Sequence, residues 1–169
     1  SCFAYAKNMV EMGIEPTLCV LAADKVEEMG KILGKNVTVM EKKVAVINCA
    51  GASTAEKGFL YDGIVSCFAL SHLNGGDILC RYSCLGLGDC VTVCPFNAIS
   101  MGDGRGVRID AERCIGCGKC VIECPRQVIR LIPASAVPVI ACRTKDPGKS
   151  VRQICKTGCI TCKLCIKSC

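Results

Sequence analysis

The chain has 169 residues with a formal net charge of +6, and 18 of its residues are cysteines, whereas tryptophan is absent. No apolar run reaches the roughly 18 residues of a membrane-spanning helix, and no signal peptide marks the chain as secreted. In a reducing compartment so many cysteines favour metal binding over disulfides, and metal cross-links then supply part of the stability. The absence of a Gly-x-Gly-x-x-Gly fingerprint after a strand argues against a Rossmann nucleotide site.

The first segment, residues 1–35, opens with SCFAYAKNMVEMGIEPTLC. In it, Cys2 and Cys19 flank an amphipathic helical pattern that includes Phe3 and Val10. Two cysteines cannot saturate a cluster. The segment is therefore predicted to be part of a 4Fe–4S domain that is cut on its N-terminal side.

Residues 36–79 are interpreted as a linker and strand region with extra cysteine ligands, Cys49 and Cys67. A short helix is predicted over residues 67–74. It carries His72, the only histidine of the chain, which is predicted to be a surface or packing residue rather than a metal ligand.

The clearest motif is CIGCGKCVIECP at residues 114–125. Its spacing is C-x2-C-x2-C-x3-C-P, the bacterial ferredoxin run in which three thiolates bind one 4Fe–4S cluster and the fourth binds a neighbouring cluster. The predicted ligands are Cys114, Cys117, Cys120 and Cys124. Zinc is the alternative, but zinc sites usually pair two short cysteine knuckles instead of placing four cysteines in one run.

An incomplete copy of this run lies 30 residues upstream, because CVTVCPFNAISM (90–101) aligns with CVIECPRQVIRL (120–131). In chain order, the incomplete copy is called the first run and the complete one at residues 114–125 the second run. Leu87 takes the place of one cysteine. Residues 80–132 are therefore predicted to form a two-cluster ferredoxin-like domain, with GDGRG (102–106) as a turn before a short strand. By the exchange rule, the last cysteine of each run binds the cluster of the other run. Cys94 joins the cluster of Cys114, Cys117 and Cys120, while Cys124 joins Cys84, Cys90 and a replacement ligand, for which Cys80 is the nearest candidate.

A longer repeat appears at a shift of 75 residues. It superposes Cys67, Cys80, Cys84, Cys90 and Cys94 on Cys142, Cys155, Cys159, Cys165 and Cys169, with Cys162 opposite Leu87. Residues 133–169 are thus interpreted as the start of a second ferredoxin-like module, cut on its C-terminal side. The strand pattern VAVINC (44–49) also resembles VPVIAC (137–142).

Five cysteines outside the runs are candidate ligands of further clusters, with buried free thiols as the alternative. They are Cys49, Cys67, Cys80, Cys142 and Cys155, and the sequence does not fix their pairing. All 18 cysteines are predicted metal ligands, and several 4Fe–4S clusters are the predicted cofactors. The predicted fold class is α+β, a small iron–sulfur domain followed by tandem ferredoxin-like modules with little regular structure.

The positive charge gathers at one end of the chain. Residues 143–169 hold Arg143, Lys145, Lys149, Arg152, Lys156, Lys163 and Lys167 against one acid, Asp146. Such a patch is suited to steering an acidic ferredoxin toward a cluster, or it offsets the negative charge of the clusters themselves. Nucleic acid is not indicated as a partner, because no aromatic residues interleave with the basic ones.

Together, CLGLGDCVTVCPFNAISM, the complete run, ACRTKDPGKSVRQICKTGC and the N-terminal SCFAYA segment resemble the B subunit of the Rnf complex in its clostridial, cysteine-rich form. The resemblance implies an electron-transfer subunit of a membrane-bound, ion-pumping ferredoxin:NAD oxidoreductase, with no complete active site in this chain. It implies reduced ferredoxin as electron donor, other Rnf subunits as partners, and a place on the cytoplasmic face of the membrane through an anchor outside this sequence. Cys2 and Cys19 match the third and fourth ligands of the family's N-terminal cluster. A polyferredoxin module of another soluble redox enzyme and a zinc-bound scaffold are the alternative functions.

Overall fold

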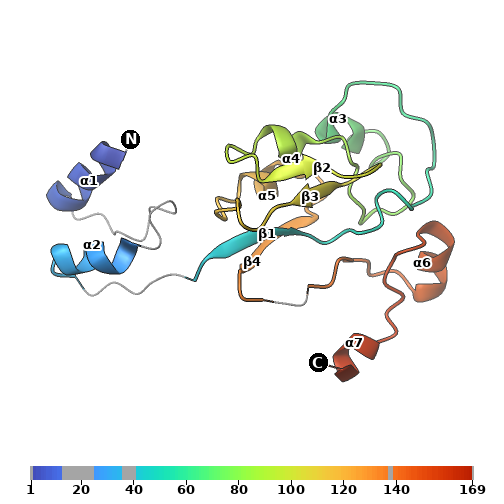
Figure 1. Ribbon diagram of the computed structural model, residues 1–169. Coiled ribbons are helices and arrows are strands. Elements are labelled where there is room, and N and C mark those ends of the chain that lie inside the picture. The colour runs from blue at the N-terminus through green and yellow to red at the C-terminus, as the bar shows by residue number, and fades with distance from the viewer. Residues whose placement is uncertain (1, 13–24, 36–40, 137–138, 169) are drawn as a thin grey trace.

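The computed structural model describes residues 2–12, 25–35, 41–136 and 139–168, so that Cys19 and Cys169 lie outside the described residues. It combines short helices and short strands, as the α+β class predicts (Figure 1). The helices are α1 (Cys2–Glu11), α2 (Val26–Ile32), α3 (Cys67–Ser71), α4 (Asp89–Thr92), α5 (Lys119–Glu123), α6 (Gly148–Ile154) and α7 (Leu164–Ser168). The strands are β1 (Lys43–Ile47), β2 (Ile99–Met101), β3 (Val107–Ile109) and β4 (Ile129–Pro133).

The two longest strands pair across most of the chain. β1 runs antiparallel to β4, with Val44 opposite Ile132 and Ile47 opposite Ile129. Val44 and Ile129 are buried and anchor the main apolar core. A strand from the region interpreted as a linker therefore completes the sheet of the predicted ferredoxin-like domain.

The second pair of strands is the predicted hairpin. β2 and β3 are antiparallel, with Met101 opposite Val107, and the GDGRG segment connects them. Arg105 in this turn donates a hydrogen bond to the buried carboxylate of Asp77 at 2.7 Å and another to the carbonyl of Leu85 at 3.2 Å. The turn is thus fixed to the segment that leads into the first cysteine run.

The 30-residue repeat extends to the backbone. Gly86 and Gly116 have φ values of 69° and 71°, and Gly88 and Gly118 have φ values of 90° and 78°. Glycine reaches this left-handed region without steric cost. α4 and α5 each begin directly after the second glycine, and the two helices contact each other.

The C-terminal cysteine run has the same loop conformation without glycine. Thr161 and Lys163, which are the counterparts of Gly86 and Gly88 at a shift of 75 residues, have φ values of 59° and 61°. A β-branched residue in this region is a rare outlier, because its side chain crowds the backbone. The three runs therefore share one loop geometry although their sequences differ at these positions.

The N-terminal helices lie apart from the strands (Figure 1). The predicted amphipathic helix is present as α1, but Phe3 and Val10 are 81% and 74% exposed, and Met9 is the buried residue. Among the helices that the structure describes, none has the length and apolar character that crossing a membrane requires.

Candidate metal centres

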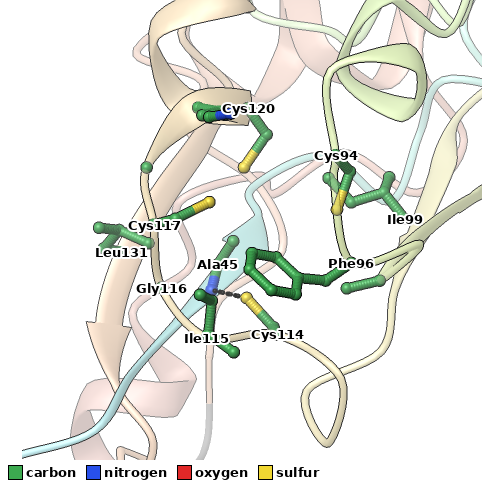
Figure 2. Close-up of a pocket in the computed structure, with 13 residues that line it drawn as sticks. Ala45, Cys94, Phe96, Ile99, Cys114, Ile115, Gly116, Cys117, Cys120 and Leu131 are labelled. Carbon is green, nitrogen blue, oxygen red and sulfur yellow. Dashed lines mark hydrogen bonds between the residues drawn. The ribbon is translucent and has the colours of Figure 1, made fainter. Parts of the chain in front are cut away.

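Four cysteines line one pocket beside β1 and β4, and we call this pocket site A (Figure 2). They are Cys94, Cys114, Cys117 and Cys120. Cys94 approaches from the first run, whereas the other three lie on the loop and helix of the second run. The structure thus brings together the four cysteines that the exchange rule pairs.

The wall of site A suits an anionic group with sulfur ligands. Phe96, Ile99 and Leu131 make much of it apolar. The backbone N–H of Ala45 on β1 donates to Sγ of Cys114 at 3.3 Å. A Cβ on Gly116 would lie 2.4 Å from the carbonyl oxygen of Lys43, so only glycine lets the loop approach the strand this closely.

A second pocket, site B, also has four cysteines. They are Cys67, Cys84, Cys90 and Cys124. Cys124 comes from the second run and completes the reciprocal exchange. The fourth thiol is that of Cys67 at the start of α3, and not that of Cys80, which lines a different pocket. The interpretation of Cys80 as the replacement ligand for Leu87 is therefore corrected.

Asp89 explains how Cys67 reaches site B. Its carboxylate accepts hydrogen bonds from the backbone N–H of Cys67 at 2.8 Å and of Phe68 at 3.0 Å, and from Oγ of Ser66 at 2.9 Å. Burial opposes the charge, but these hydrogen bonds hold the pKa of Asp89 below its ordinary value. The first residue of α4 thus caps α3 and positions Cys67 beside the run.

Sequence reasoning overlooked Asp89. The signal was an acid in the first run where the complete run has Lys119.

Leu87 does not form the wall of site B. Leu85 and Val128 line the pocket, whereas Leu87 packs against the small apolar cluster of Cys67, Leu70 and Leu85. Its contribution is to hold α3 in place.

Three thiols of these sites have high proton affinity. Burial raises the pKa of the Cys84 and Cys90 thiols to about 12, and that of the Cys120 thiol to about 11. At neutral pH they stay protonated unless a cation replaces the proton. Binding of iron therefore has to release protons.

A third pocket collects four of the five cysteines that lie outside the runs. Cys49, Cys80, Cys142 and Cys155 line it, and Cys49 forms an isolated antiparallel bridge with Cys142. Cys67 and Cys142 correspond in the 75-residue repeat, but they lie in different pockets. Cys142 lies opposite Cys49 in the third pocket, whereas Cys67 lines site B.

The remaining described cysteines lie at the two ends. Cys159 is partly buried, and Cys162 and Cys165 are exposed on the C-terminal run. Cys2 is exposed on α1, and its predicted companion Cys19 is not among the described residues.

The donor set fits iron–sulfur clusters. Every cysteine in the described ranges has a free thiol. Within those same ranges, no group of three or more His, Cys, Asp or Glu side chains could hold a metal ion. A zinc ion with bonds of about 2.3 Å needs sulfurs roughly 3.8 Å apart. A cluster offers iron at several corners and so accepts thiolates that surround a pocket. His72 lines none of these three pockets; it is exposed and contacts Phe68, as predicted for a surface or packing residue.

Comparison with known proteins finds an iron–sulfur family that matches part of the chain and three similar proteins. Residues 80–128 match the family of 4Fe–4S dicluster domains. The chain is similar to the B subunit of the proton-translocating ferredoxin:NAD(+) oxidoreductase complex of Clostridium ljungdahlii, with 42% identity over 94% of this chain and 57% of the relative.

Two further relatives have related descriptions. The B subunit of the ion-translocating oxidoreductase complex of Methanosarcina acetivorans is 38% identical over 99% of this chain and 64% of the relative. The B subunit of the Na(+)-translocating ferredoxin:NAD(+) oxidoreductase complex of Acetobacterium woodii is 37% identical over 94% of this chain and 48% of the relative. The chain thus spans about half to two thirds of the length of these relatives. They confirm the resemblance to the B subunit of the Rnf complex, and the dicluster match indicates iron–sulfur clusters as cofactors.

Proposed function

We propose that this chain is an electron-transfer part of an ion-translocating ferredoxin:NAD oxidoreductase, in which 4Fe–4S clusters carry electrons from reduced ferredoxin toward other subunits. The observation that carries the proposal is the reciprocal exchange of Cys94 and Cys124 between two four-thiol pockets. A bound cluster supplies one-electron redox chemistry without a change in its ligands. The similarity to three B subunits supports the assignment to this complex.

The protein's own residues set the conditions for this transfer. Apolar walls keep water from the clusters, and backbone N–H groups directed at sulfur stabilise the negative charge of the reduced state. Ala45 provides such a donor in site A. In site B the guanidinium of Arg126 lines the pocket and interacts electrostatically with Cys124.

The finer assignments belong to the same proposal. The proposed domain division places the tandem ferredoxin-like modules from residue 80 onward. Its four parts are residues 1–35, 36–79, 80–132 and 133–169. Further clusters use Cys2 and Cys19 at one end and Cys159, Cys162, Cys165 and Cys169 at the other. The other partners are the remaining subunits of the complex, on the cytoplasmic face of the membrane.

The test is an anaerobic preparation of the chain. We expect a brown protein with broad absorption near 400 nm, bleached by dithionite, with equal amounts of iron and acid-labile sulfide. Mixed with reduced ferredoxin, it should accept electrons at a rate that falls with ionic strength. Zinc without sulfide would contradict cluster binding. If the protein contained its clusters but accepted no electrons from reduced ferredoxin, the result would instead favour a module of another redox enzyme.

A further inference from the structure

The pocket lined by Cys49, Cys80, Cys142 and Cys155, here named the bridging site, belongs to neither site A nor site B. Only Cys80 of the four lies within the matched dicluster domain at residues 80–128. Two of the cysteines precede the second run and two follow β4, so the pocket forms where two distant segments meet. The backbones of the two segments are paired by one isolated β-bridge between Cys49 and Cys142 and by a second between Ala55 and Cys155.

The two halves of the bridging site repeat the same contacts. The backbone N–H of Cys84 donates to Sγ of Cys49 at 3.3 Å, and the backbone N–H of Cys159 donates to Sγ of Cys142 at 3.3 Å. Each donor opens a cysteine run, and each run has a further cysteine four residues before it: Cys80 in one case and Cys155 in the other. The four thiols are therefore arranged as two equivalent pairs.

We infer that the bridging site binds an additional 4Fe–4S cluster through Cys49, Cys80, Cys142 and Cys155, and that this cluster connects site B to the C-terminal run. The inference rests on the proposed iron–sulfur function and extends it. A cubane presents four iron corners, one for each of the four thiols. Four thiolates complete its ligation.

The surroundings of the bridging site suit an anionic cluster. Val151 and Ile154 of α6 form an apolar part of the wall, and Arg143 adds a positive charge. Arg126 stands between this site and site B, because it lines site B and also interacts electrostatically with Cys80. Its Nε is buried without a hydrogen-bond partner.

The wall of the bridging site is also closely fitted. A Cβ on Gly51 would lie 2.4 Å from Sγ of Cys155. The backbone at Gly51 therefore has to stay bare for the Cys155 thiol to occupy its present place.

The position of the bridging site makes it a relay. Cys84 is a thiol of site B, and its backbone also donates to Cys49 of the bridging site. Cys159 has the same double position between Cys142 and the C-terminal run. Electrons can thus pass, one at a time, from site B through the bridging cluster to the C-terminal run, with no bond made or broken.

The experiment compares three single variants of the whole chain, each prepared anaerobically: Cys142→Ala, Cys80→Ala and Thr157→Ala. Thr157 is the matched control, because it lines the same pocket and its hydroxyl lies 3.8 Å from Sγ of Cys155. Each cysteine variant should contain about one to four iron atoms fewer per chain than the original protein, because the three remaining thiolates hold at most a three-iron cluster. Thr157→Ala should retain the full amount.

A cysteine variant that keeps all its iron and sulfide would overturn the bridging cluster, as would a loss of zinc instead of iron. An original protein without iron and sulfide would instead overturn the proposed function, and the inference with it.

A second measurement needs no variant and covers the case in which the variants do not fold. Cys80 and Cys142 are partly exposed in the structure and so should react with iodoacetamide as free thiols. In the loaded protein their alkylation, followed by mass spectrometry, should be at least about tenfold slower than after chelation of the iron, because a bound thiolate is not available for attack. Equal rates before and after chelation would refute ligation by these two residues.

Discussion

At position 87 a leucine occupies the place that Cys117 has in the complete run. The structure supplies the missing thiol of site B from Cys67, on a helix that precedes the run. The loop itself keeps the conformation of a ligand loop, since Gly86 and Gly88 have nearly the φ values of Gly116 and Gly118. A cysteine restored at position 87 should therefore be able to bind.

This leads to a loss-and-rescue prediction. Cys67→Ala should remove the 4Fe–4S signal of site B from the EPR spectrum or convert it to a three-iron form, because three thiolates remain. The double variant Cys67→Ala, Leu87→Cys should recover most of that signal. Iron content measured alongside serves as the check. If Cys67→Ala left the spectrum of the reduced protein unchanged, the assignment of Cys67 to site B would be wrong.

Asp89 gives a second prediction at the level of a single residue. It accepts two backbone hydrogen bonds at the start of α3, in the manner of a helix cap supplied from another segment. Asp89→Ala should lower the free energy of unfolding by about 1–2 kcal/mol, in the range measured for lost caps. It should also speed the loss of the site B cluster to a chelator.

The control for Asp89→Ala is Asp110→Ala. The carboxylate of Asp110 likewise accepts two backbone hydrogen bonds, from Glu112 and Arg113, but these residues carry no thiol. Equal rates of cluster loss in the two variants would show that Asp89 acts only on general stability.

Among the elements, the β2–β3 turn depends on one buried ion pair. The side chain of Asp77 is fully buried, and the side chain of its partner Arg105 is 21% exposed. Arg105→Met should lower the free energy of unfolding by about 3–5 kcal/mol, because it leaves an uncompensated buried charge.

The double variant Arg105→Met, Asp77→Leu should recover much of that loss, since a buried ion pair can often be replaced by apolar side chains at little cost. Urea unfolding of the loaded proteins, under anaerobic conditions, measures both changes. A single variant that loses less than about 1 kcal/mol would mean that water reaches Asp77.

The elements also show how far the sequence leads. The two ferredoxin runs, the turn at residues 102–106 and the placement of Cys94 and Cys124 each beside the cysteines of the other run follow from a local repeat, and the structure contains each of these features. Local spacing could not choose between Cys67 and Cys80. That choice depends on α3 folding back to Asp89, a contact between separate segments. The pairing of β1 with β4 could not be predicted either, because the residue pattern of a strand does not determine which other strand it pairs with.

The C-terminal run illustrates a limit of a different kind. Its cysteine spacing predicts cluster ligands. A sequence with threonine and lysine at positions 161 and 163 does not predict the left-handed backbone conformation that Thr161 and Lys163 both adopt. Strained backbone of this kind persists where surrounding interactions determine it.

For the molecule as a whole, the basic C-terminal region raises the question of docking. Arg143 donates to the backbone carbonyls of Arg126 and Gln127, and Asp146 pairs with Arg81, so these two charges have internal partners. Lys149 and Arg152 on α6 are exposed and lie around an open pocket. These two charges are therefore free to meet an acidic protein.

Reversal of these two charges gives the corresponding prediction. Lys149→Glu with Arg152→Glu should slow the oxidation of reduced ferredoxin by about tenfold at low ionic strength and much less at high salt, because screening removes electrostatic steering. Stopped-flow absorbance measures the rate. Lys7→Glu with Lys31→Glu, which reverses as many charges on α1 and α2, should have little effect. An unchanged rate in the α6 variant with its clusters intact would favour charge balancing as the role of the basic residues.

The bridging site also has a consequence for how the protein matures during synthesis. All the thiols of sites A and B have left the ribosome once Cys124 has emerged, whereas the bridging site has to wait for Cys142 and Cys155. Until then Cys49 and Cys80 remain without their partners, and such thiols are open to oxidation. Biogenesis of this protein is therefore expected to fill the bridging site after sites A and B, and brief exposure of the nascent chain to oxygen should damage the bridging site before those two.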